Sequence, residues 1–373
     1  MTHILINDGS RHIYSTGYGN LSRAIITSLD AHTSADLSLR YRKGDVPDEI
    51  REKAVLDRIP VWEPGDDFDC ILRVSHPPDT PIHGKKPLIF YTQNALGELI
   101  PEWLLGLKNA RGIVVPSEFD ADVFRRHFPN VYVCHQYVDE HLFKNRAHYR
   151  KDGPDEFSFL FVGSYGYRKG VDLLLEAFAK AFDNGQKVSL TLHCFTGLEQ
   201  SAINDLVARA RALPDNVRLN VFSGTVAPAW MARLYNNHDC IVSFSRGEGW
   251  CMPLHEALLC EKPIIAPNST SMGECLPDQG VIKVETEAKL ISDITEPFGM
   301  SVKKRYGVPG NTVFEVDPDA AIAALREMYE NHESYARDTK QGRAFITQTY
   351  SKPSMAKKIM AAVDDVMDKF ASE

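Results

Sequence analysis

Short apolar runs alternate with longer segments of helical periodicity along the whole chain, and this alternation is the strongest constraint on its fold. Parallel strands joined by right-handed helical crossovers produce such a pattern, so the sequence predicts an α/β protein. In the first half we expect strands at His3–Asn7, Leu37–Tyr41, Ile59–Trp62, Cys70–Val74, Leu88–Tyr91, Gly112–Val115 and Val131–Cys134, and helices at Gly19–Ala31, Pro101–Asn109 and Glu118–Phe128.

The alternation resumes after a break at Asn145–Glu156, a stretch with a Gly-Pro pair and no apolar periodicity. It predicts an interdomain linker. In the second half we expect strands at Phe157–Val162, Lys187–Phe195, Val217–Phe222, Cys240–Phe244, Pro263–Ala266 and Val281–Val284, and helices at Gly170–Phe182, Ser201–Ala212, Pro228–Asn236, Pro253–Cys260, Pro318–Asn331 and Tyr335–Thr349.

The length of 373 residues exceeds what one hydrophobic core usually serves, which favours two domains. We place them at residues 1–150 and 151–350. A final amphipathic helix, 352–371, is expected to pack back on the first domain.

The charge of the chain limits its partners. It carries 42 basic and 50 acidic residues, a net charge of -8, which argues against an extended nucleic-acid surface. It contains no apolar run of about 18 residues, and its N-terminus lacks the zones of a signal peptide. We expect a cytoplasmic protein.

The spacing of the seven cysteines fits neither CxxC pairs nor zinc fingers, so we expect them to be reduced and structural.

A first candidate site follows the strand that ends at Val162. The segment Phe161–Phe178, FVGSYGYRKGVDLLLEAF, combines a strand, a glycine-containing turn and a helix, which is typical of phosphate sites. Arg168 and Lys169 there could bind a diphosphate, although a solvated pair of cations explains them equally well. The segment matches neither GxGxxG nor the P-loop pattern.

The segment Ser245–Leu259, SRGEGWCMPLHEALL, is more informative. Pro253 suits the first turn of a helix, which puts Glu248 in the preceding loop and Glu256 on the helix. The backbone N–H groups of Gly249–Leu254 are then expected to be unpaired at the positive end of the helix dipole, a seat for phosphate oxygens. Carboxylates beside a phosphate are better used on hydroxyls, so we expect one glutamate to bind a ribose and the other a sugar ring.

Both segments resemble the retaining glycosyltransferases of family four (glycosyl transferases group 1), which have the GT-B fold of two Rossmann-like domains facing across a cleft. The likeness covers most of the chain and includes 115–128, 138–143 and 217–250. It implies a first domain on the acceptor side and a second domain that binds a nucleotide-diphosphate sugar.

The resemblance also implies roles for individual residues. Arg168 and Lys169 would hold the donor diphosphate, Glu248 would face the transferred sugar, and Glu256 would hold the ribose. The donor-binding set that it implies is Gly17, Tyr18, Gly19, Gly163, Ser164, Gly224, Ser245, Gly249, Trp250, Cys251, Met252, Pro253, Leu254 and Glu256.

Several positions depart from the family pattern. Ser164 replaces an arginine, whereas Cys251 and Glu261 replace glycines. In Phe90–Leu96, where family members often place a His-Asp pair near the sugar, this chain has Gln93 and Asn94. Gln93 can donate a hydrogen bond but cannot carry a proton, and His76 is the nearest alternative contact.

The implied reaction is transfer of a hexose to an acceptor hydroxyl with retention of anomeric configuration. A UDP sugar is slightly preferred over a GDP sugar as co-substrate. The acceptor stays open among carbohydrate, lipid-linked glycan, protein and small metabolite. No cofactor or metal is required, because the cations stabilise the leaving diphosphate; Asp66–Asp67 falls in a loop outside the donor region.

Two rival functions share this fold. One is a GT-B sugar epimerase or phosphorylase, and the other is a non-catalytic sugar- or partner-binding scaffold. At Arg125–His127 a basic patch offers peripheral contact with the inner face of a membrane, although a solvated helix face explains it more simply.

Overall fold

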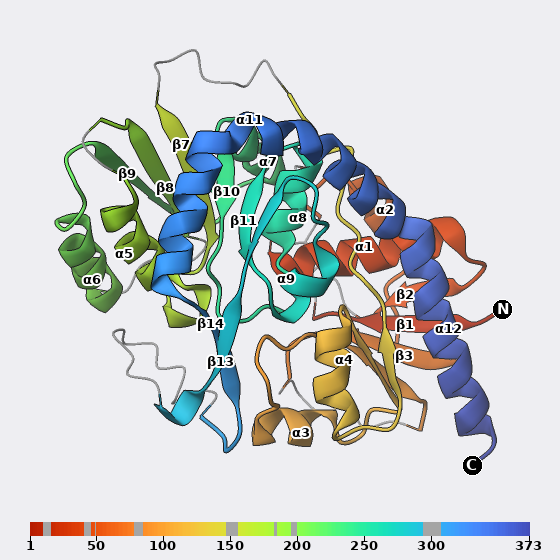
Figure 1. Ribbon diagram of the computed structural model, residues 1–373. Helices are drawn as coiled ribbons and strands as arrows, with labels where there is room; N and C mark the ends of the chain where they lie inside the picture. The colour runs from red at the N-terminus through yellow and green to blue at the C-terminus, as the bar shows by residue number, and fades with distance from the viewer. Residues whose placement is uncertain are drawn as a thin grey trace. The chain divides into compact units, whose positions relative to one another are not determined.

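The computed structural model describes residues 1–9, 16–40, 46–48, 50–77, 85–146, 156–182, 185–194, 200–293 and 307–373. Two compact units make up the chain (Figure 1). The first contains Met1–Asn94, Leu99–Val138 and Thr349–Glu373, and the second contains Ala95–Glu98 and Asp139–Gln348. The chain passes from the first unit to the second between Val138 and Asp139, before the linker expected at 145–156. Residues 147–155 of that linker lie outside the described residues.

The first unit is built on a six-stranded parallel sheet in the order β2-β1-β3-β4-β5-β6. Its strands are β1 His3–Asn7, β2 Asp36–Leu39, β3 Cys70–Val74, β4 Leu88–Tyr91, β5 Gly112–Val115 and β6 Val131–Val133. Its helices are α1 Gly17–His32, α2 Lys53–Arg58, α3 Pro101–Leu107, α4 Glu118–Arg125 and α12 Lys352–Ala371.

The last helix, α12, packs on this first unit beside α1 (Figure 1). Ser351 caps it by accepting a hydrogen bond from the N–H of Ser354. Met355, Ile359 and Val366 lie on one face and join the core of the first sheet. The expected amphipathic helix therefore buries its apolar face in the core of the unit that contains the N-terminus.

The second unit is built on another six-stranded parallel sheet, in the order β12-β11-β10-β7-β8-β9. Its strands are β7 Phe157–Gly163, β8 Val188–Cys194, β9 Val217–Ser223, β10 Cys240–Val242, β11 Ile264–Pro267 and β12 Val281–Val284. Its helices are α5 Val171–Ala181, α6 Gln200–Ala210, α7 Pro228–Asn236, α8 Met252–Leu259, α9 Thr270–Cys275, α11 Pro318–Thr349 and the 3₁₀ segments η3 Tyr167–Lys169 and η4 Ile291–Asp293.

An antiparallel pair, β13 Thr286–Leu290 and β14 Thr312–Val316, is added to this second unit. The sequence prediction missed both strands, together with α2 and α9. Helix α11 combines the two helices expected at Pro318–Asn331 and Tyr335–Thr349, with a kink at Asn331, where the backbone leaves helical geometry (φ -114°, ψ 19°). The predicted break was therefore in the right place but does not end the helix.

Most of the predicted elements are confirmed, within a few residues at their ends. The strand expected at Ile59–Trp62 is wrong, since only a single bridge joins Val61 to Leu39 there. Helix α1 begins at Gly17 rather than Gly19 because Thr16 caps it. Within the described residues, no helix combines the length and the apolarity needed to cross a bilayer.

Candidate functional site

The strand order of the second sheet places the two candidate segments, Phe161–Phe178 and Ser245–Leu259, beside each other. From β7 the chain proceeds outward through β8 and β9, and it then returns to pair β10 with the other edge of β7. Open α/β sheets bind ligands beyond the carboxyl ends of their strands at such a reversal. Since Arg168 and Lys169 follow β7 and Glu248 follows β10, the topology brings them together.

Glu248 is the centre of the resulting cluster. Its carboxylate accepts hydrogen bonds from the Lys169 ammonium and from the Ser245 hydroxyl, the latter at 2.8 Å. Arg168 Nη1 lies 3.4 Å from the other carboxylate oxygen. Glu248 is only 6% exposed, so these contacts are formed in a site largely shielded from water.

These contacts decide the charge of Glu248. Burial acts to raise its pKa, but the charges of Lys169 and Arg168 and the hydrogen bonds from Lys169 and Ser245 outweigh it and lower the pKa to about 2. The carboxylate is therefore ionised near neutral pH. It can accept hydrogen bonds from hydroxyl groups and stabilise positive charge, but it has no proton to donate.

The backbone around Glu248 is held from both sides. On one side, Arg168 Nη1 donates to the carbonyl oxygen of Gly247 at 2.7 Å. On the other, the Thr270 hydroxyl accepts from the Glu248 N–H at 3.3 Å, and the Ser271 hydroxyl donates to the Glu248 carbonyl oxygen at 2.9 Å. The sequence prediction missed Thr270 and Ser271, which begin α9 and have no distinguishing motif.

Helix α8 begins directly after this loop, as predicted, with Pro253 in its first turn. Within the described residues, the N–H groups of Gly249, Cys251 and Met252 have no hydrogen-bond partner. The expectation is wrong for Leu254, whose N–H donates to the Cys251 carbonyl oxygen at 3.1 Å. The other three N–H groups are available to an anion at the helix N-terminus.

Cys251 adopts a left-handed backbone (φ 58°, ψ 59°), and so does Glu261 (φ 56°). These are the two positions at which the sequence departs from a family glycine. Glycine adopts this conformation without steric cost, so the structure explains the family preference. This chain keeps the backbone geometry without the glycines.

Trp250 and His255 form a buried stacked pair beside the loop. Their rings are nearly parallel, with an interplanar angle of 6° and centroids 4.3 Å apart. The His255 Nδ1 atom also lies 3.2 Å from the Cys251 carbonyl oxygen. The indole of Trp250 is thus fixed against α8, and only 1% of the residue is exposed.

Glu256 lies on α8 in a different electrostatic environment. The Tyr235 hydroxyl donates to its Oε2 atom at 2.7 Å, and both residues are buried. Burial raises the pKa of Glu256 to about 8, and the hydrogen bond from Tyr235 only partly opposes this rise. At neutral pH Glu256 is mostly protonated, so its carboxyl group can both donate and accept. Tyr235 had no sequence signal beyond its place on an amphipathic helix.

Two glycines allow the turns of the site to approach other backbone. At Gly170 (φ 68°), an added Cβ would lie 2.0 Å from the carbonyl oxygen of Phe244. At Gly247 it would lie 1.9 Å from the carbonyl oxygen of Ala95. Side chains at these two positions would collide with main chain, so the close approach of these turns requires glycine.

The remaining predicted residues of the second unit lie at strand ends or beside them. Gly163 is the last residue of β7 and Ser164 follows it, so the fold places both near Arg168 along the chain. Gly224 follows β9 with φ 113°, and its N–H donates to the Cys194 carbonyl oxygen at 2.8 Å.

The predicted residues of the first unit form a separate group. Gly17, Tyr18 and Gly19 lie in the first turn of α1 rather than in a loop. The ring of Tyr18 contacts His76, with centroids 5.2 Å apart, and His76 also packs edge-on against Trp103. His76 is exposed, so these contacts leave part of its ring accessible to a ligand.

Gln93, the other predicted sugar contact, follows β4 in the same unit. Its Oε1 atom accepts a hydrogen bond from Gln136 Nε2 at 2.8 Å. With one end of the Gln93 amide occupied by Gln136, the other end is the group that could contact a ligand.

Two other sequence features can be placed. Arg125, in the basic patch, forms ion pairs with Glu118 at 2.9 Å and Asp122 at 3.3 Å, which offset its positive charge. All seven cysteines are free and buried, as expected for structural residues. Across the described ranges, no His, Cys, Asp or Glu side chains gather in a group of three or more that could hold a metal ion.

Comparison with known families decides between the interpretations of these segments. Residues 156–296 match the family described as Glycosyl transferases group 1. The predicted family resemblance is confirmed. The match lies within the second unit and contains the Arg168–Lys169 pair, Glu248 and Glu256. No curated protein sequence matches the chain.

Solved structures show the same fold at low sequence identity. Anabaena HepE, in complex with UDP and glucose, is 15% identical, with a TM-score of 0.67 over 98% of this chain and 100% of its own. Sucrose-phosphate synthase from Thermosynechococcus elongatus is 17% identical, with a TM-score of 0.68 over 100% of both chains. A glycosyltransferase from Rickettsia africae is 11% identical, with a TM-score of 0.67 over 98% of both. The predicted GT-B fold, with two Rossmann-like domains, is confirmed.

Proposed function

We propose that this protein is a retaining glycosyltransferase that moves a hexose from a nucleotide-diphosphate sugar to an acceptor hydroxyl. The observation that supports this most strongly is the ionised Glu248 carboxylate held between Lys169 and Arg168 at the sheet reversal. The match of this region to a glycosyltransferase family gives independent support.

Arg168 and Lys169 are proposed to bind the donor diphosphate. In the structure they pair with Glu248, so an incoming diphosphate would compete for both cations. The N–H groups of Gly249, Cys251 and Met252 at the start of α8 would complete the anion site. Donor binding then releases Glu248 from part of its ion pairing, and the carboxylate becomes free to accept hydrogen bonds from the sugar.

The reaction requires one bond to form and one to break at the anomeric carbon. The acceptor hydroxyl oxygen attacks that carbon as its bond to the phosphate oxygen breaks, on the same face, which retains the configuration. The hydroxyl proton moves to an oxygen of the departing diphosphate. Arg168, Lys169 and the α8 N-terminus stabilise the charge that develops on the leaving group, and Glu248 stabilises the cationic sugar.

Glu256 is proposed to bind the donor ribose. With its pKa near 8 the carboxyl group is mostly protonated at pH 7, so it can donate to one ribose hydroxyl and accept from the other. Tyr235 occupies Oε2, which leaves Oε1 as the atom directed to the ligand.

The first unit is proposed to supply the remaining donor and sugar contacts. Gly17, Tyr18 and Gly19 begin α1. Since the Thr16 hydroxyl accepts from the Gly19 N–H, the N–H of Gly17 is the group proposed to bind a phosphate. Gln93 and His76 are the candidates for a hydrogen bond to the sugar. The acceptor is expected to be a carbohydrate or lipid-linked hydroxyl.

A UDP sugar is the preferred donor. Structures of HepE, which shares this fold, were determined with UDP and with UDP-glucose. A thermal-shift comparison of UDP, GDP and ADP tests the base, and we expect UDP to give the largest stabilisation. Incubation with UDP-glucose and a panel of hydroxyl acceptors, followed by proton NMR of the product, tests transfer and anomeric retention.

The incubation with UDP-glucose also separates the rival functions. Turnover of the donor without an acceptor and without hydrolysis identifies an epimerase, and release of a sugar phosphate in the presence of inorganic phosphate identifies a phosphorylase. Donor binding without turnover, unchanged by Glu248→Ala, identifies a binding scaffold. Each of these results would contradict the proposed transfer.

A further inference from the structure

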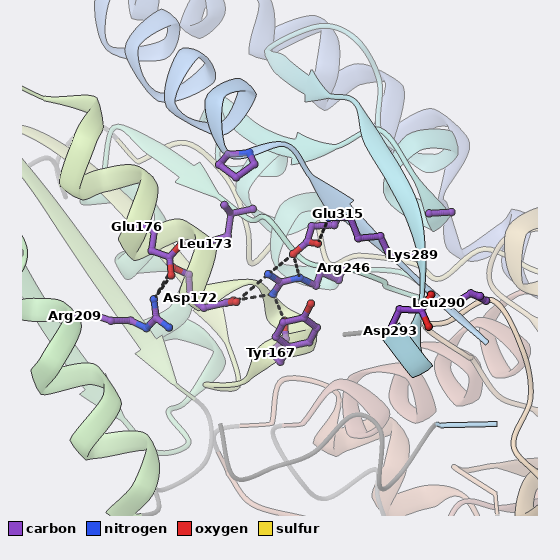
Figure 2. A pocket seen from close by; sticks show the side chains of 12 residues that line it. Tyr167, Asp172, Leu173, Glu176, Arg209, Arg246, Lys289, Leu290, Asp293 and Glu315 are labelled. Atoms are coloured by element: carbon purple, nitrogen blue, oxygen red, sulfur yellow. Dashed lines mark hydrogen bonds and ion pairs between the residues drawn. The ribbon is translucent and has the colours of Figure 1, made fainter. Parts of the chain in front are cut away.

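Arg246 lies two residues before Glu248 and has no part in the proposed reaction, yet its side chain makes five hydrogen bonds. Arg246 lines a cavity of about 850 Å³ together with residues of α5, α6 and the β13–β14 pair (Figure 2). Only 3% of Arg246 is exposed. A buried guanidinium requires partners for its five donors, and the structure supplies them from three elements.

Two carboxylates bind the guanidinium from opposite elements, as Figure 2 shows. Asp172 on α5 accepts from Nη1 and Nη2 at 2.7 and 2.9 Å, a bidentate pair. Glu315 on β14 accepts from Nε and Nη2 at 3.0 and 2.8 Å. Lys289 on β13 offsets the second acidic charge, with Nζ 2.7 Å from Glu315 Oε2. The four side chains form a neutral, interlocked network.

The same arginine holds the 3₁₀ segment that carries the proposed diphosphate cations. Its guanidinium lies over the Tyr167 ring, 3.7 Å from the centroid, and Nη1 donates to the Tyr167 carbonyl oxygen at 2.6 Å. Its backbone N–H donates to the Arg168 carbonyl oxygen at 2.7 Å. Arg246 is therefore hydrogen-bonded to the carbonyl oxygens of both Tyr167 and Arg168. Glu248 lies two residues after Arg246 in the chain.

The charges on Arg246 and Glu315 stabilise each other. Burial acts to lower the pKa of Arg246, but Asp172 and Glu315 raise it overall. Burial likewise acts to raise the pKa of Glu315, whereas Lys289 and Arg246 lower it overall. The ion pair between Arg246 and Glu315 is therefore present near neutral pH.

We propose that Arg246 is a positioning residue that holds the backbone of 167–169 beside Glu248, so that the side chains of Arg168 and Lys169 can transfer from Glu248 to a bound diphosphate. This inference rests on the proposed function of those three residues. Glu315 lies beyond residue 296, where the family match ends, so part of the network comes from a strand outside the matched segment. Lysine cannot replace Arg246, because one ammonium cannot bind both oxygens of Asp172, bind Glu315 and lie over the Tyr167 ring together.

The test compares Arg246→Met with Arg209→Met in the full chain. Arg209 is a suitable control because it also lines the cavity and pairs with two carboxylates, Asp205 and Glu176. Its link to the network is a long hydrogen bond from Nη1 to the Asp172 carbonyl oxygen at 3.5 Å, which does not involve the Asp172 carboxylate. The probe is UDP, GDP or ADP, whichever stabilises the wild-type protein most. Its dissociation constant is measured by calorimetry, well below the unfolding temperature of each variant.

We expect Arg246→Met to weaken binding of the nucleoside diphosphate about tenfold and to lower kcat/KM by about 100-fold, a magnitude typical of a misplaced catalytic group. Arg209→Met should change either quantity less than about twofold, even if it lowers stability by a similar amount. Arg246→Lys should resemble Arg246→Met rather than the wild type. Equal dissociation constants for wild-type protein and Arg246→Met would overturn the proposal.

Hydrogen exchange separates this inference from the proposed function. In Arg246→Met, the amides of 167–170 and 245–248 should exchange faster than in the wild type or in Arg209→Met, whether or not a nucleotide binds. If the wild type binds none of the three nucleotides but this change is seen, the positioning role stands and the proposed function fails. Unchanged exchange overturns the positioning role.

Arg246→Met removes the bidentate partner of the buried Asp172 carboxylate, whereas Glu315 keeps its ion pair with Lys289, and the loss at Asp172 could prevent folding. Glu315→Ala then decides the question, because it removes the side-chain link to β14 while keeping the bidentate pair with Asp172 and the backbone hydrogen bond from Phe314. We expect it to weaken nucleotide binding about threefold and to increase exchange at 167–170. Wild-type affinity in a folded Glu315→Ala protein would overturn the proposal.

Discussion

Replacing Glu256 with glutamine should stabilise the protein at neutral pH. Burial raises the pKa of Glu256 from 4.5 to about 8 in the folded state. The folded protein therefore keeps a proton that the unfolded chain loses between these pH values, so stability falls as pH rises through this window. Glutamine is neutral at every pH and can accept the hydrogen bond of Tyr235 through its side-chain oxygen.

The magnitude follows from the two pKa values. The difference between 4.5 and about 8 corresponds to about 5 kcal/mol of unfolding free energy once both states are ionised. At pH 7 the folded state still holds most of its proton, and the expected gain of Glu256→Gln is about 3 kcal/mol. Near pH 4.5 and below, where Glu256 is protonated in both states, the variant and the wild type should have nearly equal stability.

Urea-induced unfolding at pH 4.5, 7 and 9 measures this dependence. Pulsed hydrogen exchange of peptides that cover β7 and β10 reports the second unit specifically, since both strands lie in its core. The same variant should bind a nucleoside diphosphate sugar more weakly, because Glu256 is proposed to contact the ribose. A gain in stability with a loss of affinity is the pattern expected of a functional group in a strained environment.

Glu248→Gln provides a control of opposite sign. Lys169 and Arg168 overcome the effect of burial and lower the pKa of Glu248 from 4.5 to about 2, which contributes about 3 kcal/mol of stability above pH 4.5. This contribution is lost as pH falls from 4.5 towards 2. The variant should thus be less stable than wild type at pH 7 and approach it in acid. Equal, pH-independent effects of Glu256→Gln and Glu248→Gln would refute the electrostatic account of both carboxyls.

Three further results are expected. Gly170→Ala should destabilise the second unit by at least about 2 kcal/mol, because the added Cβ would meet the Phe244 carbonyl oxygen and the backbone is left-handed; urea unfolding measures this, and an unchanged midpoint would contradict the geometry. Glu261→Gly should gain about 0.5–1 kcal/mol by relieving the left-handed backbone, whereas Glu261→Ala, which keeps a Cβ, should gain nothing in the same assay. Transfer activity should survive prolonged EDTA treatment; loss of activity that added Mg²⁺ or Mn²⁺ restores would disprove metal independence.

The alternation of apolar runs and helical segments was sufficient to predict both parallel sheets. Buried strands such as Phe157–Gly163 are almost continuously apolar, and glycine or polar residues mark their ends. Strand β13, Thr286–Leu290, was missed because its residues are mostly exposed and polar and give no apolar periodicity. Strand β14, Thr312–Val316, is a short run of five residues that are buried or partly buried. The pairing of β13 with β14 depends on contacts between residues that are distant in sequence, and a local sequence pattern does not specify such contacts.

The site was predictable to a different degree at each residue. Glu248 and the pair Arg168–Lys169 were found because they stand in recognisable segments, and the strand order then brings those segments together. Arg246 stands in the same segment as Glu248, yet its role depends on Glu315, which is distant in sequence. No local pattern specifies such a contact.

The two replaced family glycines show why a departure in sequence need not change a site. At Cys251 and Glu261 the backbone remains left-handed, although a non-glycine residue there costs about 1–2 kcal/mol. At Cys251 this geometry begins α8 directly after the loop that carries Glu248, so it determines where the first N–H groups of the helix point. Those groups, and not the side chain, are what a phosphate would bind. Local strain at Cys251 is therefore compatible with the proposed anion site, and selection on function would tolerate it more readily than a change of backbone.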